Sequence, residues 1–455
     1  MESSIDKKHI RDEIARIAGP VFVELLMGTL FGMVDMIMLG RSGDNVTTAA
    51  SIAAVGVTNQ LIFLGLSLVQ SLNIGATSMV ARYIGAKRED RIEAVVKHIM
   101  ILTQALLVIP ILFIGLGMTN TAMRFFGAHA DTISIGSGYF RVIALGFIFQ
   151  AFNFSIFAAL RGSGDTKTPM KINIKVNLLN VVGNALLIYG LFGFPRLGVL
   201  GAGISTSFSQ VVASLMVIRV ILNENNIVHL KIRNKFKFDR DIIYNLVKIG
   251  VPASLEQVAM RTGLLVFSKI VASLGTVAYA THQICINILS LSFTPGQSFG
   301  ISASTLTGRS LGEEEPEKAE MYIKSCGKIG SVISTAMALI FFFFGHTIAS
   351  MYTNNSEVVA EAARVLKLMA LIQPFQSSQL IIAGGLRGAG DTVWTLVSTF
   401  IGILLIRLAL SYIFVIRLGM GLMGAWLAVL IDQAIRWLLI LIRLKTNKWK
   451  YVSIR

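Results

Sequence analysis

The sequence LRGSGDT at residues 160–166 returns as LRGAGDT at residues 386–392, 226 positions further on. Other patterns recur at nearly the same distance. Pro20 followed by Glu24 matches Pro252 followed by Glu256, and GVLGA at 198–202 matches GLMGA at 421–425. These offsets are close to half of the 455 residues. The sequence therefore predicts an internal duplication, an arrangement that many membrane transporters share.

The composition excludes a soluble globular domain. Hydrophobic residues make up 54% of the chain and charged residues only 15%, whereas about a quarter of a soluble domain is charged. The two cysteines, Cys285 and Cys326, are too few for a disulfide framework or a four-cysteine zinc site. We therefore expect an integral membrane protein.

Twelve apolar stretches are each long enough to cross a bilayer, which takes roughly 20 residues of helix. They predict an all-α membrane protein with six spans in each half. The predicted spans are 14–40, 50–77, 93–117, 132–157, 168–191, 199–222, 244–272, 276–304, 319–345, 357–384, 392–416 and 421–444.

The net charge of +16 follows this topology. Most of the 41 Lys and Arg lie in the N-terminal segment, the even-numbered loops and the C-terminal tail. Because basic residues concentrate on the cytoplasmic side of membrane proteins, we expect a multi-pass protein of the cell membrane with both termini in the cytoplasm. This placement also argues against a nucleic-acid partner. Of the Lys and Arg residues, the odd-numbered loops contain only Arg41, Arg124, Arg196 and Arg417.

An even number of spans returns the chain to the cytoplasm after each half. The repeat is therefore expected to be parallel, with its pseudo-two-fold axis along the membrane normal. We expect an N-terminal lobe over 1–222, a basic cytoplasmic linker over 223–243 and a C-terminal lobe over 244–455. The linker is interpreted as a connection between the lobes.

Asp35, Glu24 and Glu256 lie inside predicted spans, where an ionisable side chain is costly and is a functional candidate by default. Asp35 stands five residues before Gly40, and Glu24 and Glu256 each follow a proline by four residues. Burial favours the neutral form of a carboxyl, which would suit proton exchange at Glu24 and Glu256. The alternatives are that Asp35 reaches the headgroup region and that each glutamic acid bonds a neighbouring helix.

A stripe of asparagines follows the fifth predicted span. Asn173, Asn177, Asn180 and Asn184 are spaced by four, three and four residues, which places them on one helical face. Such a stripe in an apolar helix either bonds a neighbouring helix or forms an oxygen-rich wall for a cation.

Other intramembrane charges have a structural interpretation. Asp432 and Arg436 stand four residues apart in the last span, so they can neutralise each other. Arg407 and Arg261 have no evident partner in the sequence.

The LRGxGDT repeat falls in two loops between spans. Its glycines permit a tight reversal, and Asp165 and Asp391 are placed to cap the following helices. The lysine and the strand of a phosphate-binding P-loop are missing, so we expect a structural role. The chain also lacks a His-x-x-x-His pair and a Walker A lysine. We expect neither an enzyme nor a cofactor.

Taken together, these features resemble the multidrug and toxic compound extrusion (MATE) transporters over nearly the whole chain. The resemblance rests on the order and spacing of short motifs and on twelve spans in two lobes. The motifs are GP at 19–20, VDMIMLG at 34–40, both copies of LRGxGDT and ATHQI at 280–284.

The resemblance implies an antiporter that exports small cationic and amphipathic organic compounds in exchange for protons or sodium ions. Its two lobes would rock between an outward-open and an inward-open state. We expect it to work as a monomer among membrane lipids.

The resemblance also implies where ions bind. An N-lobe site would use Asp35, Asn180, Asn184 and Thr206, with Asp35 and Asn180 as possible sodium ligands. Asn184 stands where related members have an aspartate, which removes one formal charge.

A C-lobe ion site of some members is matched by Glu256, but the aspartate that they carry on the tenth span is missing from QPFQ at 373–376. Substrate contacts are expected from Asp35, Glu256 and Gln283.

A lipid-linked oligosaccharide flippase of the same superfamily is the alternative function. It would need a cationic cleft for pyrophosphate, which Arg141, Arg261 and Arg407 would supply if they converge.

Overall fold

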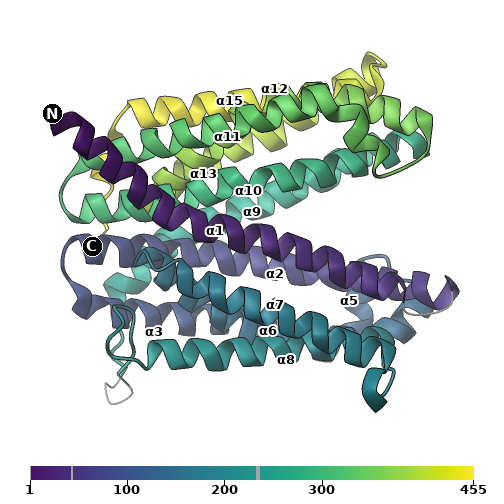
Figure 1. The fold of residues 1–455 in the computed structure, drawn as a ribbon, viewed down its shortest axis with the longest axis horizontal. Coiled ribbons are helices and arrows are strands. Elements are labelled where there is room, and N and C mark those ends of the chain that lie inside the picture. Colours follow the sequence, from purple (N-terminus) through teal and green to yellow (C-terminus); the bar gives the residue numbers. More distant parts are fainter. Residues whose placement is uncertain (1, 42–44, 232–235, 455) are drawn as a thin grey trace. The chain divides into compact units, whose positions relative to one another are not determined.

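The computed structural model describes residues 2–41, 45–231 and 236–454, and within these ranges the chain is mostly helical (Figure 1). In two stretches, Glu89–Gly117 and Thr392–Arg417, π-helical turns alternate with α-helical ones. The helices are α1 (Glu2–Gly40), α2 (Asn45–Gly85), η1 (Glu89–Arg91), α3 (Ile92–Thr103), η2 (Gln104–Val108), α4 (Ile109–Leu112), η3 (Phe113–Gly117), α5 (Thr119–Phe125), α6 (Ala130–Gly162), α7 (Lys167–Tyr189), η4 (Leu191–Gly193), α8 (Gly198–Ile221), α9 (Arg240–Ala272), α10 (Thr276–Gly312), α11 (Pro316–Ser350), α12 (Ser356–Gly388), α13 (Thr392–Thr399), η5 (Phe400–Arg407), α14 (Leu408–Tyr412), η6 (Ile413–Arg417), α15 (Gly421–Lys445) and η7 (Lys448–Tyr451).

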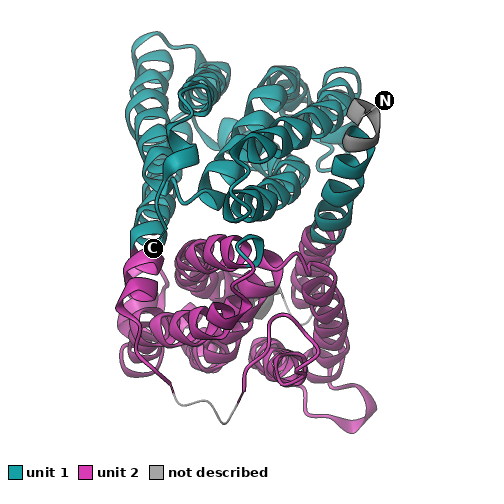
Figure 2. Cartoon of the chain, turned by 90° about the vertical axis from the view of Figure 1, so that its left-hand side faces the viewer, with its two compact units in different colours: residues 1–22, 84–86, 248–455 teal, residues 23–83, 87–247 magenta. Residues whose placement is uncertain are grey.

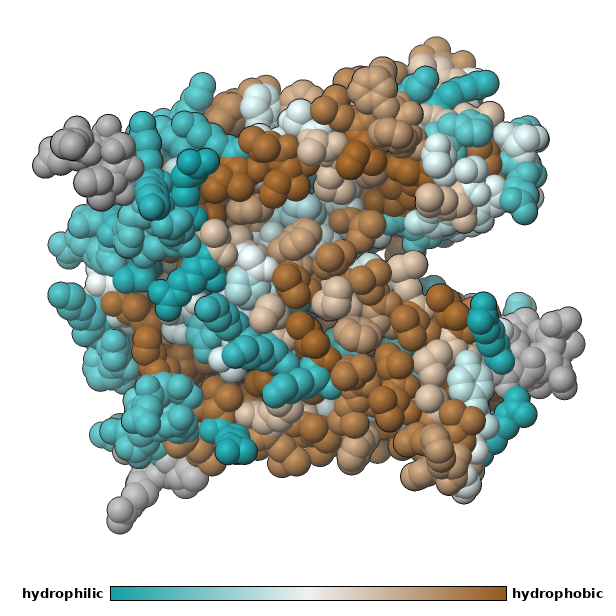
Figure 3. Space-filling view, in the orientation of Figure 1, coloured by the Kyte–Doolittle hydropathy of each residue, from teal (hydrophilic) through white to brown (hydrophobic). Residues whose placement is uncertain are grey.

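Each predicted span coincides with one long helical stretch. Among the described residues, nine of these stretches are long and apolar enough to cross a membrane. The other three predicted spans fall on α9, α10 and α12, which have 33, 37 and 33 residues and bury polar side chains such as Glu256, Ser298 and Gln373. On the face drawn in Figure 3, hydrophobic residues cover the middle of the helices and hydrophilic residues gather toward their ends. The prediction of an all-α, multi-pass membrane protein is confirmed.

Two compact units divide the chain, and Figure 2 colours them teal and magenta. Unit 1 consists of residues 1–22, 84–86 and 248–455, and unit 2 consists of 23–83 and 87–247. The units follow the two halves of the repeat except at three places. The beginning of α1 and residues 84–86 belong to unit 1, and the linker with the beginning of α9 belongs to unit 2. Residues 232–235 of the predicted linker lie outside the described residues.

The beginning of α1 is held in unit 1 by an apolar stripe. Ile10, Ile14 and Ile17 are spaced by four and three residues, so they share one helical face. All three are buried in one cluster with Phe299 and Leu306 of α10. Because burying a large aliphatic side chain contributes about 1.5–3 kcal/mol, this stripe is sufficient to hold the helix end in place.

The described part of the linker is hydrogen-bonded to α3. His98 is buried, its Nδ1 lies 2.7 Å from the Ala94 carbonyl oxygen, and its Nε2 accepts the Asp239 amide at 2.9 Å. The Asp239 carboxylate accepts the Ile242 amide at the start of α9 and bonds Arg91 at 2.6 Å. Burial would raise the pKa of Asp239, but its backbone N–H donors and the Arg91 charge outweigh burial and lower that pKa. The linker therefore does more than connect, because it anchors the start of α9.

The first glycine of each LRGxGDT copy lets two helices touch. A Cβ added to Gly162, at the end of α6, would lie 2.6 Å from the Thr77 carbonyl oxygen of α2. A Cβ added to Gly388, at the end of α12, would lie 2.1 Å from the Ser304 carbonyl oxygen of α10. Only glycine fits at either position without moving backbone, so the motif sets the same close helix contact in both halves.

The rest of the motif makes the turn. Gly164 and Gly390 have φ of 88° and 86°, a left-handed conformation that other residues rarely adopt. Asp165 accepts a backbone N–H of α7 at 3.0 Å, as predicted for a helix cap. The same prediction is wrong for Asp391, which makes no capping hydrogen bond and instead bonds Arg443 Nε at 2.6 Å.

We expect Gly388→Ala to lower the free energy of unfolding by about 1–3 kcal/mol, because the added methyl group overpacks a tight contact. Gly327→Ala on α11 is the matched control, since its Cβ would meet no atom within 4 Å. Denaturant or thermal unfolding of the purified protein in detergent measures both variants. Equal stability of the two variants would contradict the close approach of α12 to α10.

Candidate functional site

Glu24 on α1 is buried in unit 2 beside the arginine of the first LRGxGDT copy. Arg161 Nη2 lies 2.6 Å from Glu24 Oε1, and the side-chain amide of Asn173 on α7 donates to the same oxygen at 2.5 Å. Only 7% of Glu24 is exposed. A cation from the last turn of α6 therefore compensates this carboxylate directly.

Glu256 on α9 has the same surroundings in unit 1. Arg387 Nη2, from the second LRGxGDT copy, lies 2.7 Å from Glu256 Oε1. The hydroxyl of Thr395 donates to Oε2 at 2.9 Å, and that of Thr399 donates to Oε1 at 3.1 Å. Glu256 is 1% exposed, so both of its oxygens are bonded inside the protein.

The two pairs are copies of one another, because the glutamates recur 232 residues apart and the arginines 226. Each glutamate therefore bonds a neighbouring helix, which is the alternative given above, and its partner there is a cation. An arginine is always protonated in a protein, so neither glutamate has to be neutral to be buried. The sequence contained a usable signal for these partners, since both recurring motifs repeat at nearly the same offset.

Asp35, further along α1, is surrounded by neutral polar groups of α7 and α8. Asn184 Nδ2 donates to Asp35 Oδ1 at 2.8 Å. In the amide orientation that satisfies all its neighbours, Asn180 Nδ2 donates to both Asp35 oxygens at 3.1 Å, and its Oδ1 accepts from the Thr206 hydroxyl and amide at 3.1 Å. The structure thus brings together the four residues of the predicted N-lobe ion site. Asn180 and Asn184 are buried, and Asp35 and Thr206 are half-buried.

The asparagine stripe of α7 forms hydrogen bonds with two acidic residues of α1, Glu24 and Asp35. Asn173 bonds Glu24 and Asn184 bonds Asp35, and both pairs are separated by 149 residues in sequence. The two helices therefore keep one register over eleven residues, roughly 16 Å at the α-helical rise. Both interpretations of the stripe have a place here: Asn173 bonds a neighbouring helix, and Asn180 and Asn184 add amide groups around a carboxylate.

Asp35 differs from the two glutamates in its charge balance. Among the described residues, no lysine or arginine forms an ion pair with Asp35, whereas each glutamate has its arginine. The Asn184 Oδ1 atom is buried without a hydrogen-bond donor. The site combines carboxylate, amide and hydroxyl oxygens, which are the ligands that hard cations take. A proton on Asp35 would satisfy the same charge.

A third charged cluster lies in unit 1, on η5 and α15. Arg407 Nη2 lies 2.5 Å from Asp432 Oδ2, and Arg436 Nε lies 3.1 Å from Asp432 Oδ1. All three residues are buried, and a Cβ on Gly402 would lie 2.3 Å from both Arg436 Cγ and Asp432 Oδ1, so the cluster is tightly packed. Asp432 is therefore the missing partner of Arg407. The interpretation of an isolated Asp432–Arg436 pair is incomplete.

The Asp35 site has no copy in the second half. Phe267 stands at the equivalent position of the repeat, with the guanidinium of Arg407 5.7 Å from its ring centroid. On α12, Gln373 donates to the Ser292 hydroxyl at 3.0 Å. Gln283 is half-buried on α10, and its contact with substrate stays a prediction.

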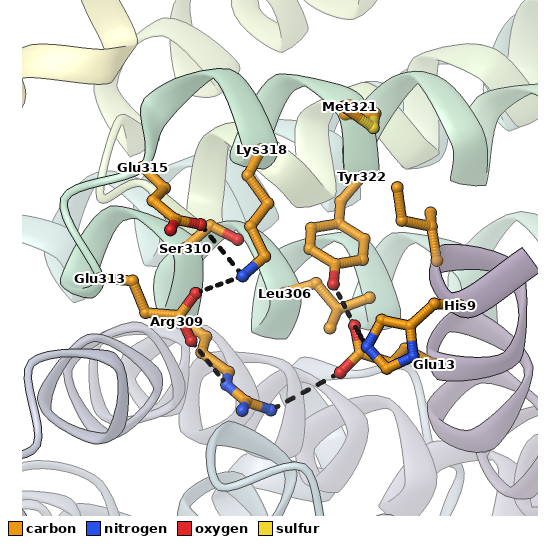
Figure 4. A pocket seen from close by; sticks show the side chains of 11 residues that line it. His9, Glu13, Leu306, Arg309, Ser310, Glu313, Glu315, Lys318, Met321 and Tyr322 are labelled. Atoms are coloured by element: carbon orange, nitrogen blue, oxygen red, sulfur yellow. Dashed lines mark hydrogen bonds and ion pairs between the residues drawn. The ribbon is translucent and has the colours of Figure 1, made fainter. Parts of the chain in front are cut away.

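A cavity of about 390 Å³ lies among α1, α10 and α11 in unit 1 (Figure 4). Its walls carry opposite charges that pair with one another. Lys318 bonds Glu313 at 2.7 Å and Glu315 at 3.0 Å, and Arg309 bonds Glu313 at 3.2 Å and lies 4.0 Å from Glu13. Because each of these charged side chains lies in an ion pair, we interpret the cavity as part of the packing of the α1 end.

A duplicated set of long apolar helices with carboxylates inside them is typical of membrane transporters. The MatE family model matches residues 20–186 and 252–413, once in each half. The chain is 30% identical to "Multidrug resistance protein NorM" of Vibrio cholerae, over 93% of this chain and 95% of that protein. It is 29% identical to "Probable multidrug resistance protein NorM" of Thermotoga maritima, over 97% and 93%. A solved outward-facing "multidrug resistance MATE family transporter of the MOP superfamily" superposes with a TM-score of 0.87 at 25% identity, covering 96% of this chain and 97% of that one.

The chain belongs to the MatE family, the multidrug and toxic compound extrusion proteins. This is a family of transporters rather than enzymes, and the twelve-helix fold predicted from the sequence is confirmed.

We expect Asp432→Asn to be strongly destabilising, by about 3–5 kcal/mol, because it leaves two buried arginines without their shared counter-charge. Arg407→Gln should cost less, since it leaves the neutral Asp432–Arg436 pair. Unfolding in detergent compares the two variants. An Arg407→Gln variant less stable than Asp432→Asn would contradict this account of the cluster.

Proposed function

We propose that the protein is a multidrug efflux antiporter that exports organic cations in exchange for protons or sodium ions. It works by alternating access between two lobes, as a monomer in the cell membrane with both termini in the cytoplasm. The proposal is supported by membership of the family and by relatives named as multidrug resistance proteins. Coupling to a cation is supported by the Asp35 site.

The observation that carries the proposal is the unequal charge balance of Glu24, Glu256 and Asp35. Glu24 and Glu256 each hold an arginine at 2.6 and 2.7 Å, and Asp35 is bonded only to neutral groups among the described residues. A carboxylate inside a membrane protein is costly without a positive partner. Asp35 must therefore recruit its cation from outside, which is the step that coupling requires.

The surrounding residues give this step its chemistry. Asp35 supplies the charge, and Asn180, Asn184 and Thr206 supply neutral ligands that hold the carboxylate in place. A proton, a sodium ion and a cationic substrate all compete for one negative charge. The ion must bind with different affinity in the two states of the lobes, because a ligand of equal affinity shifts no equilibrium.

The contacts of the intramembrane arginines argue against the flippase alternative. It needs unengaged guanidinium groups, but Arg407 is held by Asp432 at 2.5 Å, and Arg141 Nε donates to the Thr119 hydroxyl at 3.3 Å. Arg261 remains as an exposed residue of α9. One arginine is a weak basis for a pyrophosphate site.

We expect Asp35→Asn to reduce ion-driven efflux of a cationic dye from proteoliposomes to the level seen without a gradient. Sodium and pH gradients are imposed separately, so that the stimulating gradient identifies the coupling ion. Asp131→Asn, at the exposed start of α6, is the matched control and should transport normally. Undiminished coupled efflux in Asp35→Asn would refute the assignment of Asp35.

Asn184→Ala should change ion binding without abolishing transport. It removes a hydrogen bond that Asn184 donates to the Asp35 carboxylate, which stabilises the charged, ion-free form by about 1.5–3 kcal/mol. If the coupling ion is a proton, the proton concentration for half-maximal efflux should then fall about tenfold or more. If it is sodium, the sodium concentration should rise, because the Asn184 Oδ1 ligand is lost. Ion titrations of dye efflux measure this shift, and an unchanged midpoint would mean that Asn184 is no part of the ion site.

A further inference from the structure

The carboxylate of Glu256 sits in surroundings that would otherwise suit a cation. Its two oxygens lie with the hydroxyls of Thr395 and Thr399, at 2.9 and 3.1 Å, in a place that is almost fully buried. Carboxylate and hydroxyl oxygens are ligands of hard cations. The positive charge in this oxygen set is the guanidinium of Arg387, 2.7 Å from Oε1.

The other half repeats the arrangement. Arg161 lies 2.6 Å from Glu24 Oε1, and Asn173, at the position equivalent to Thr399, bonds the same oxygen. Both arginines occupy the second position of the LRGxGDT motif and are largely buried, with 17% and 19% of their side chains exposed. One carboxylate and one guanidinium are therefore paired at the same place in each half.

We propose that Arg161 and Arg387 are built-in counter-cations, which occupy the place of an exchangeable ion at Glu24 and Glu256 and so confine ion exchange to Asp35. This inference rests on the proposed function, because it concerns which acid takes the coupling ion. It makes the arginines positioning residues that act through the carboxylates they hold.

The chemistry of arginine explains why Arg161 and Arg387 stay permanently at Glu24 and Glu256. A guanidinium does not lose its proton at any physiological pH, and a side chain cannot diffuse away as a bound ion can. A sodium ion or a proton would have to break the Arg387 bond and leave the guanidinium buried without a partner, which is strongly unfavourable. If the guanidinium of Arg387 is removed, the buried carboxylate of Glu256 loses its positive partner and must take a cation from solution.

The test counts the cations that the purified full-length protein binds. Equilibrium dialysis with radioactive sodium gives the sodium ions per chain at saturation, and potentiometric titration from alkaline to neutral pH gives the protons bound at neutral pH. Arg387→Gln should bind one cation more than the unaltered protein, as sodium or as a proton. Arg387→Lys keeps the positive charge and should bind no more than the unaltered protein. The double variant Glu256→Gln with Arg387→Gln removes both charges and should also show no gain.

A folded Arg387→Gln protein that gains neither a sodium ion nor a proton would overturn the inference. If that variant does not fold, Glu256→Gln decides alone: the number of bound cations should stay unchanged, and a decrease would overturn the inference. The proposed function is tested by a separate arm, because Asp35→Asn should lose one cation. An unchanged count in Asp35→Asn would refute the Asp35 site and leave the result for Arg387 interpretable by itself.

Discussion

The ion pair between a buried glutamate and the arginine of LRGxGDT is the interaction on which both halves of this protein depend. A carboxylate in a membrane-spanning helix is tolerated only with a partner, and here the partner comes from the last turn of another helix, α6 or α12. The pair ties the first helix of each half to the end of that helix. In the first half it also fixes the register of α1 against α7, because Asn173 bonds the same Glu24 oxygen as Arg161. Eleven residues further along, the same register brings Asp35 to Asn184.

Beyond the shared pair the halves diverge. Where α1 carries Asp35, α9 carries Phe267, and the nearby charge is the guanidinium of Arg407. The first half therefore has a carboxylate among neutral ligands, whereas the second has two arginines on one aspartate. Duplication preserved the scaffold, including both glycines of each motif, and left the chemistry of the two halves free to differ.

Most of the fold could be predicted from the sequence. The length of the apolar stretches, the basic residues in the loops and the recurring motifs can each be recognised without knowing how the helices pack. The positions that shape the LRGxGDT turn were also readable, except that Asp391 bonds Arg443 instead of capping. Local spacing could not show which charges meet, and the nearly equal offsets of the two motifs were the one signal for the Glu–Arg pairs. Arg161 and Glu24 are 137 residues apart, and Arg387 and Glu256 are 131 residues apart. Such partners depend on how helices pack, and no local spacing rule reports them. The residues around Asp35 were found only because the family resemblance named them, since the spacing of the asparagine stripe was equally compatible with helix bonding.

Because charge is distributed differently in the two halves, only the first half is expected to bind cations in the proposed cycle. In the second half, Arg407 and Arg436 outnumber Asp432, and Arg387 balances Glu256, so an additional cation would meet a positive field. In the first half, Arg161 balances Glu24 and Asp35 remains negative until something binds. Attraction for both a coupling ion and an organic cation is therefore concentrated at one carboxylate. Two positive ligands that need the same negative charge exclude each other, and this exclusion is the physical requirement for exchanging one for the other.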